Sequence, residues 1–350
     1  MISRIFQILV FAAVVCACRQ TAAVSSVGNG CAYAMFFELP QDGSVVTVSP
    51  YSGKRDTLEL TDPVTDVVCL SSTYVACLSA VEADSVVCGV SGLKYLNEDF
   101  LAGNTSVADV GYDSFLDFEL ILSLDPDLVV AYVIGSSEPP YIGKLRSLGV
   151  PLLLLYDYME QHPLARAEYV RLFGALTGRR AQADEYFAEV CHRYDSLRVD
   201  VHAAEVESGT KKVLMNALYG DVWYIPGADN YISRLVRDAG GEVLGAMPGC
   251  SESRAVGMEE AFGLSQEADL WLCPGASRSL EELKAAHRMY SLFGPVAKGY
   301  PVYNNNLLVN DAGGNDFYQT GAVRPDLILE DLIGIISGCP GSFHFFQPLL

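Results

Sequence analysis

The feature that most constrains this chain is a repeated alternation of strand-like and helix-like segments. A first series has strand-like apolar runs at 67–70, 86–90, 127–133 and 152–156. A second series starts at Lys212 and has strand-like runs at 213–215, 270–273 and 302–303. Strands that alternate with helices form parallel sheets, because each crossover helix returns the chain to the same end of the sheet. The pattern predicts an α/β fold with two Rossmann-like lobes.

The stretch between the two series has no strand pattern and carries one apolar stripe. Its members recur at intervals of three and four residues: Ala183, Tyr186, Phe187, Val190, Cys191, Tyr194, Leu197 and Val201. This spacing predicts a helix from about Arg180 to Glu207, roughly 40 Å long at 1.5 Å per residue. Such a helix is long enough to join two lobes, although the same periodicity also fits an ordinary core helix.

The length of 350 residues supports this division, because a single hydrophobic core stops growing at roughly 250–300 residues. An Asp-Gly turn at 42–43 between apolar runs also predicts a hairpin within residues 34–48. We therefore divide the chain as follows: 1–18 signal peptide with lipobox, 19–30 tether, 31–158 N-terminal lobe, 159–208 helical linker, 209–337 C-terminal lobe and 338–350 tail.

The N-terminus predicts export and lipid attachment. Residues 5–15 are apolar apart from Gln7, and this run is too short to span a bilayer. It leads into Val15-Cys16-Ala17-Cys18, which resembles a bacterial lipobox. Cys18 fits the modified position better than Cys16, which would place bulky Val15 beside the cleavage point. We expect a protein anchored in the cell envelope by lipid and facing the periplasm; a plain signal peptide with accidental cysteines is the alternative.

Composition excludes several function classes. The formal net charge is −20 and no basic stripe is present, so a nucleic-acid partner is not expected. The eight cysteines after residue 18 show no CxxC or zinc spacing and read as small buried hydrophobic residues, with disulfides as the alternative. The five histidines are dispersed, which disfavours a site for a bare transition metal.

Enzyme signatures are absent from the sequence. There is no G-x-S-x-G, H-E-x-x-H, P-loop or G-x-G-x-x-G motif. Glu160 and His162 fit a general-base pair, but His162 also fits a helix start before Pro163. We expect no catalytic residue and no resident cofactor.

Five stretches resemble a known family. They are V-V-C-L-S-S-T-Y-V-A at 67–76, D-V-G-Y-D-S-F-L-D-F-E-L-I-L-S-L-D-P-D-L-V at 109–129, E-Q-H-P-L-A-R-A-E-Y at 160–169, W-Y-I-P-G-A-D-N-Y at 223–231 with D-A-G-G at 238–241, and G-G-N-D-F-Y-Q-T-G-A-V-R-P-D-L-I-L-E-D-L-I at 313–333. In this order and spacing they resemble the iron-complex, heme and cobalamin substrate-binding proteins of ABC importers, especially the Bacteroidetes branch.

The resemblance implies two Rossmann-like lobes joined by a single long helix, the class III periplasmic-binding-protein architecture, with a stiff hinge. It implies a ligand held between the lobes and a permease dimer with a cytoplasmic ATPase as partner. The ligand would be an iron complex, heme or a ferric siderophore; cobalamin is the alternative. A chelatase-like enzyme on a similar two-lobed scaffold is a further alternative.

Aromatic side chains that follow predicted strands are candidate ligand contacts. They are Tyr74, Tyr95, Tyr112, Tyr132, Trp223, Tyr224 and Tyr231. Aromatic rings stack on flat ligands at low entropic cost, although any one of them also fits a core or surface position. Gly111, before Tyr112, would let backbone and ligand approach closely. Arg278, just past another strand, would pair with a ligand carboxylate or simply face solvent.

Three more roles come from the resemblance alone. A tyrosine at the position of Tyr112 ligates iron in heme-binding members, so the resemblance implies metal contact here, through a bound iron complex only. One glutamate in each lobe, at the positions of Glu119 and Glu259, meets arginines of the permease. Glu260 is the alternative to Glu259 in the second lobe. A carboxylate that favours a helix N-terminus is the other explanation for both residues.

Overall fold

The computed structural model describes residues 30–112, 115–133, 137–339 and 341–350, without the side chains of residues 199–200 and 202–208. The predicted signal peptide, the lipobox with Cys18 and nearly all of the tether lie outside these residues. In the part that is described, no helix is long and apolar enough to cross a membrane.

The first lobe is built on a five-stranded parallel sheet, in the order β6-β5-β4-β7-β8. Its strands are β4 (Val67–Cys69), β5 (Val87–Val90), β6 (Ala108–Asp109), β7 (Leu128–Tyr132) and β8 (Leu152–Leu155). Its crossover helices are α1 (Ser72–Ala80), α2 (Glu98–Gly103), α3 (Phe118–Leu124) and α4 (Pro140–Ser147). The apolar run in β4 is buried at every position, as expected for a central strand that helices cover on both faces.

The second lobe has a five-stranded sheet in the order β12-β9-β14-β15-β16, parallel except for β16. Its strands are β9 (Lys211–Met215), β12 (Gly241–Val243), β14 (Leu270–Leu272), β15 (Val302–Asn304) and β16 (Gln347–Pro348). Its helices are α7 (Tyr231–Asp238), α8 (Met258–Ser265), α9 (Leu280–Ala286), α10 (Gly294–Lys298) and α12 (Pro325–Ser337). The short helix α11 (Thr320–Val323) precedes α12 and packs on α1 of the first lobe. The predicted α/β class with two lobes is confirmed.

Two small antiparallel sheets complete the lobes. One joins β1 (Phe37–Glu38), β2 (Val45–Val48) and β3 (Arg55–Leu58), and the other joins β10 (Leu218–Tyr219), β11 (Val222–Ile225) and β13 (Arg254–Val256). The predicted hairpin at the Asp-Gly turn is present, but its first strand is shorter than expected. The backbone N–H groups of Ala32, Tyr33 and Ala34 donate to the buried carboxylate of Glu168 instead of to a strand.

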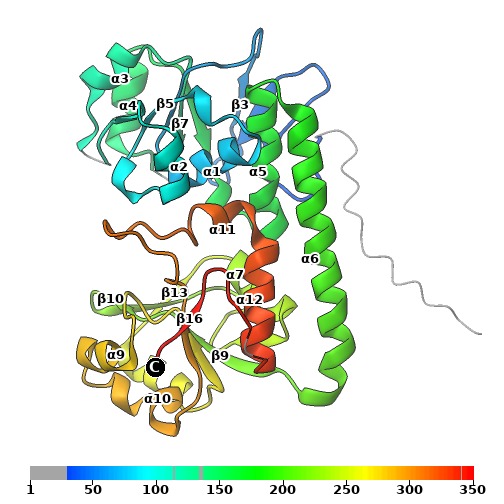
Figure 1. The fold of residues 1–350 in the computed structure, drawn as a ribbon, viewed down its shortest axis with the longest axis vertical. Coiled ribbons are helices and arrows are strands. Elements are labelled where there is room, and N and C mark those ends of the chain that lie inside the picture. Colours follow the sequence, from blue (N-terminus) through cyan, green and yellow to red (C-terminus); the bar gives the residue numbers. More distant parts are fainter. Residues whose placement is uncertain (1–29, 113–114, 134–136, 340) are drawn as a thin grey trace, which may run out of the picture.

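Helices α5 (Pro163–Leu176) and α6 (Arg180–Ser208) join the lobes. The observed limits of α6 agree with the predicted helix, and α6 runs along one side of the molecule past both lobes (Figure 1). Helix α5 packs against α6 and also contacts α1 of the first lobe and α7 of the second. The long-helix interpretation is therefore the correct one of the two that the sequence allowed.

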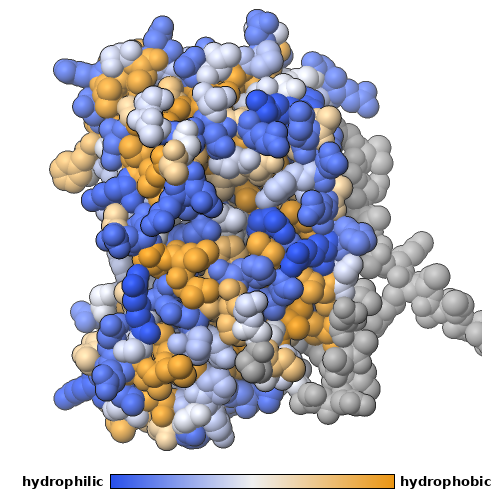
Figure 2. Space-filling view, in the orientation of Figure 1, coloured by the Kyte–Doolittle hydropathy of each residue, from blue (hydrophilic) through white to orange (hydrophobic). Residues whose placement is uncertain are grey.

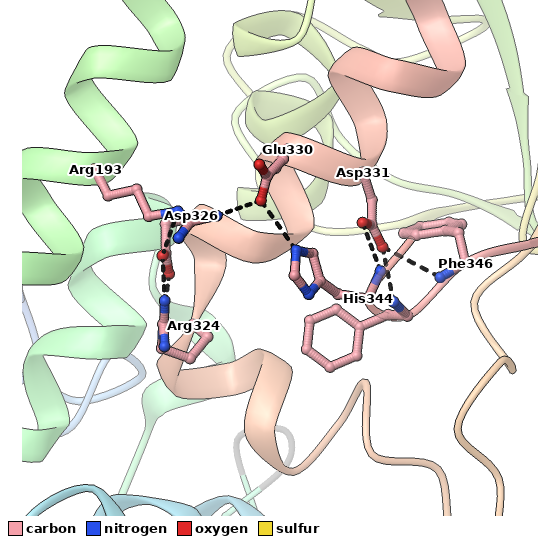
Figure 3. A network of polar contacts seen from close by, with 8 residues as sticks. Arg193, Arg324, Asp326, Glu330, Asp331, His344 and Phe346 are labelled. Carbon is pink, nitrogen blue, oxygen red and sulfur yellow. Dashed lines mark hydrogen bonds and ion pairs between the residues drawn. The ribbon is translucent and has the colours of Figure 1, made fainter. Parts of the chain in front are cut away.

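The second lobe continues to the end of the chain, beyond the boundary at 337 that we drew from the sequence. The Asp331 carboxylate of α12 accepts the N–H groups of His344, Phe345 and Phe346 at 2.7–3.2 Å (Figure 3). These bonds bring the last residues back to the sheet, where β16 pairs with β15. Beside them, Arg193 of α6 pairs with Asp326 and Glu330 of α12, which fixes the linker to this lobe.

His162 begins α5 as its N-cap, with Nδ1 accepting the N–H of Leu164 at 3.0 Å. This bond needs a neutral ring nitrogen. Burial, with repulsion from Arg234 and Arg198, lowers the pKa of His162 from 6.5 to about 3. Between these two pH values the unfolded chain binds a proton that the folded chain does not bind. The free energy of unfolding therefore decreases as the pH falls through this window.

We predict that His162→Asn makes stability less sensitive to acid. Asparagine keeps an oxygen that caps the helix but removes the titrating group. Urea unfolding at about pH 7 and about pH 4.5 should show a smaller loss of unfolding free energy on acidification in this variant than in the wild type. His192→Asn, at an exposed position of α6, is the control. Equal acid sensitivity in His162→Asn and wild type would contradict the prediction.

Candidate functional site

A cavity of about 660 Å³ lies where the two lobes face each other. On the first lobe it is lined by residues that follow β4, β5 and β6 and by the last residue of β7. On the second lobe it is lined by residues that follow β14 and β15. These are the carboxyl ends of parallel strands, where open α/β sheets bind their ligands. The space-filling view shows an apolar patch at mid-height, where the lobes meet, with hydrophilic side chains above and below it (Figure 2).

Three of the tyrosines that the sequence singled out line this cavity. Tyr95, Tyr112 and Tyr132 contribute to its first-lobe side. The rings of Tyr95 and Tyr112 meet edge to face, with centroids 6.4 Å apart. Tyr112 is 52% exposed, so its ring is accessible from the cavity. Contact of these rings with a ligand stays a prediction.

A fourth tyrosine, Tyr318, lines the cavity from the second-lobe sequence. Sequence reasoning missed it because it follows no strand directly; it lies in the long connection between β15 and α11. The motif G-G-N-D-F-Y-Q-T had drawn attention to this connection only as part of the family resemblance. The cavity therefore has phenol groups on both of its sides.

Asp109 holds together the two loops that carry Tyr95 and Tyr112. Its Oδ1 accepts the N–H of Gly92 at 3.2 Å and the N–H of Gly111 at 3.1 Å. Both glycines have positive φ, 69° and 86°. A Cβ on Gly111 would lie 2.3 Å from the carbonyl oxygen of Phe115. Gly111 is thus required by its own turn, and close approach of a ligand at this glycine stays a prediction.

The second-lobe side contributes Arg278 and three asparagines. The asparagine amides are already used by the protein. Asn306 Nδ2 donates to the carbonyl of Ser277, its Oδ1 accepts from Gln347, and Asn315 Nδ2 donates to the carbonyl of Asn305. Arg278 differs, because its side chain is exposed and takes part in no ion pair recorded among the described residues. Its guanidinium is available to an anionic group.

Tyr74 and Trp223 are wrong as ligand contacts, because both are fully buried. Tyr74 lies in the first turn of α1, donates its hydroxyl to Asp157 at 3.2 Å and stacks on Phe173. Trp223 lies on the inner face of β11, donates its indole N–H to the carbonyl of Met215, and packs in the aromatic core of the second lobe. Each has its polar atom satisfied inside the protein.

Tyr224 and Tyr231 do not line the cavity either. Tyr224 alternates with Trp223 along β11 and points to the other face of the small sheet, where it is 41% exposed. The ring of Tyr231 lies under the guanidinium of Arg166, 4.6 Å from ring centroid to Cζ. Arg166 in turn pairs with Asp157 at 3.3 Å. Tyr231 therefore helps to join the lobes next to α5.

Glu160 and His162 do not form a general-base pair. The buried carboxylate of Glu160 accepts the N–H groups of Met35 and Phe36 and the hydroxyl of Tyr169. Burial raises the pKa of Glu160 to about 8. His162 caps α5, as described above. Both side chains bind backbone N–H groups, Glu160 those of residues 35 and 36 and His162 that of residue 164.

The eight cysteines after residue 18 all lie among the described residues, and no disulfide joins any two of them. Cys31, Cys69 and Cys77 are buried, as the sequence interpretation expected, whereas Cys339 is exposed. Burial raises the pKa of Cys88 to about 11, which keeps this thiol protonated and unreactive. Among the described residues, no group of three or more His, Cys, Asp or Glu side chains is placed to hold a metal ion.

The two predicted docking glutamates are exposed, each in the first turn of a helix. Glu119 lies in α3 and Glu259 in α8. Neither takes part in an ion pair recorded for the described residues, whereas Glu260 pairs with Arg254 at 2.7 Å. The structure thus favours Glu259 over its neighbour as the second free carboxylate. Docking itself stays a prediction.

The fold and the cavity define a two-lobed solute-binding protein. Residues 67–303 match the periplasmic binding protein family, and the chain belongs to this family. Its members are solute-binding components of ABC transporters and not enzymes, so the expectation of a binding protein without catalysis is confirmed.

Relatives and solved structures agree with this assignment. An uncharacterized lipoprotein of Methanocaldococcus jannaschii is 25% identical over 306 residues, covering 81% of this chain and 68% of the relative. A periplasmic heme binding protein of Pseudomonas aeruginosa shares the fold, with TM-score 0.63, 17% identity, and coverage of 82% of this chain and 98% of that one. A periplasmic vitamin B12 binding protein of Vibrio cholerae has TM-score 0.57 and 14% identity, covering 79% and 97%. The Bacteroidetes branch stays a prediction.

Proposed function

We propose that this protein captures an iron complex, heme or a ferric siderophore, in the cavity between its lobes and delivers it to an ABC permease dimer with a cytoplasmic ATPase. The observation that carries the proposal is the set of four tyrosines, from both lobes, around one cavity of about 660 Å³. Phenolate oxygen is a ligand that proteins offer to ferric heme. Ferric iron favours the deprotonated phenol, and aromatic faces stack on a flat macrocycle.

Arg278 supports an anionic ligand. Its guanidinium is on the opposite side of the cavity from Tyr95 and Tyr112 and has no recorded carboxylate partner among the described residues. Carboxylates of a porphyrin or of a siderophore would form charge-assisted hydrogen bonds with it. The heme-binding name of the Pseudomonas aeruginosa structure agrees with this proposal. Cobalamin is the second candidate, because the Vibrio cholerae vitamin B12 binding protein has the same fold.

We predict that Tyr112→Phe distinguishes iron ligation from stacking. The variant keeps the ring and loses the oxygen. If Tyr112 ligates iron, hemin added to the wild type gives a high-spin ferric spectrum, and the variant shifts that spectrum and binds about tenfold more weakly or worse. Absorbance titration measures both. Tyr224→Phe, outside the cavity, is the matched control and should change neither. A wild type that binds cyanocobalamin but not hemin would transfer the proposal to cobalamin.

The docking role of Glu119 and Glu259 predicts a loss of transport without a loss of binding. Reversing both charges to lysine should repel the arginines expected on the permease, while the cavity stays intact. Ligand uptake by cells and ligand affinity of the purified protein are the two measurements. The control reverses Glu185 and Glu242, two exposed carboxylates elsewhere, with the same change in net charge. Equal uptake with both double variants would argue against docking through Glu119 and Glu259.

Lipid anchoring at Cys18 is the last part of the proposal. Its support is the lipobox-like sequence and the lipoprotein name of the Methanocaldococcus jannaschii relative. Each buried methylene of an acyl chain contributes about 0.8 kcal/mol, so several chains on one cysteine hold a protein to a membrane. Cys18→Ala should therefore move the protein from the membrane fraction to the soluble fraction. Cys16→Ala is the control, and an unchanged distribution of Cys18→Ala would count against the anchor.

A further inference from the structure

A long irregular segment links the two lobes at the cavity, in addition to helices α5 and α6. We call residues 305–319, between β15 and α11, the strap. It leaves the second-lobe sheet, lies between the lobes and leads into α11, which packs on α1 and α5 (Figure 1). Val309, Gly313, Gly314, Asn315 and Tyr318 of the strap line the cavity. The strap is thus both a connection and a wall of the site.

The strap is anchored in both hydrophobic cores. Phe317 is buried in the core of the second lobe, where its ring meets Phe345 and Phe346 edge on. Val323, in the helix that follows, is buried in the core of the first lobe. Rotation of the lobes away from each other would have to stretch the five residues between these anchors or withdraw one of the two anchors.

Asn310 makes polar contact from the strap to the main chain of the first lobe. Its Nδ2 donates to the carbonyls of Lys94 and Leu96, both at 2.9 Å. Its Oδ1 accepts the N–H groups of Ala312 and Gly314 at 3.1 and 2.8 Å, which form the turn that aims the amide. One side chain therefore folds the strap with its oxygen and binds the other lobe with its nitrogen.

Lys94 and Leu96, whose carbonyls accept from Asn310, are the two neighbours of Tyr95 in the chain. The backbones also touch there, because a Cβ on Gly314 would lie 2.1 Å from the carbonyl oxygen of Tyr95. On the next residue, Asn97 donates its N–H to Gln319 at 2.8 Å and its Nδ2 to Asp316 at 2.9 Å. The strap is thus hydrogen-bonded to the chain on both sides of Tyr95, at residue 94 and at residues 96 and 97.

We propose that Asn310 is a positioning residue for ligand binding: it fixes the strap to the segment 94–96 and so presets the cavity wall and the place of Tyr95. A wall held before the ligand arrives lowers the entropy lost on binding. The effect on the wall is independent of what the ligand is, whereas the effect on affinity rests on the proposed function.

Asn310→Asp tests this selectively. Aspartate keeps the oxygen that accepts from Ala312 and Gly314, but it replaces the donor with an oxygen that repels the carbonyls of Lys94 and Leu96. Asn104→Asp is the matched control. It removes a bond of similar length, from Asn104 Nδ2 to the carbonyl of Phe100 at 2.9 Å, which stays within the first lobe.

The first measurement is amide hydrogen exchange of the ligand-free protein. Asn310→Asp should speed exchange about tenfold in peptides covering 93–103 and 305–319, with protection in β7 and β14 unchanged. Asn104→Asp should change only the end of α2. A loss of protection throughout the molecule would show a general structural role and overturn the proposal, as would unchanged exchange in the strap.

The second measurement is a hemin titration of the same variants. Asn310→Asp should weaken binding about tenfold and leave the spectrum of bound hemin unchanged, because Tyr112 lies outside the affected contacts. Unchanged affinity would overturn the positioning role. If the wild type does not bind hemin, the proposed ligand is wrong, and cyanocobalamin replaces hemin in the titration. Gly314→Ala, compared with Gly263→Ala on an open face of α8, gives an independent variant of the same contact.

Discussion

The packing of α5 between the two lobes is the interaction on which the rest of the structure depends. All residues of this helix are buried except Arg166 and Arg171. A helix buried on every side has to satisfy its polar groups internally, and here they hold other segments. Glu168 holds the backbone of residues 32–34, and Arg166 lies between Asp157 of the first lobe and Tyr231 of the second. Helix α5 therefore positions both lobes and also the segment that follows the predicted tether.

This arrangement sets the shape of the cavity. Helices α5 and α6 set the distance between the lobes on one side, and the strap connects them again at the cavity itself. The amide groups of Asn306 and Asn315 in the second lobe donate hydrogen bonds to neighbouring carbonyls. These side chains therefore fix the shape of the cavity wall. The phenols, the serine hydroxyls after β4 and β5, and Arg278 line the cavity and are the groups that we propose for ligand recognition.

Most of the architecture could be predicted from the sequence, because it depends on local periodicity. The stripe from Ala183 to Val201 gave α6 almost to the residue, and the apolar runs gave the central strands of both sheets. The site was harder, since position after a strand does not say which way a side chain points. Tyr132 leaves β7 toward the cavity, whereas Tyr74 has already entered α1 and faces the core. In β11, strand alternation turned Trp223 inward and Tyr224 outward.

The strap could not be found in the sequence for a different reason. Its contacts join residues more than 200 positions apart, such as Asn310 with Leu96, and neither partner has a distinctive local pattern. The asparagine-rich sequence at 304–315 would be typical of any surface loop. Only the fold shows that the amide of Asn310 donates to two main-chain carbonyls in the other lobe. A side chain that binds main-chain carbonyls has no characteristic partner residue, because every residue type carries a carbonyl. The contacts that hold this wall of the cavity therefore leave no pattern in the sequence.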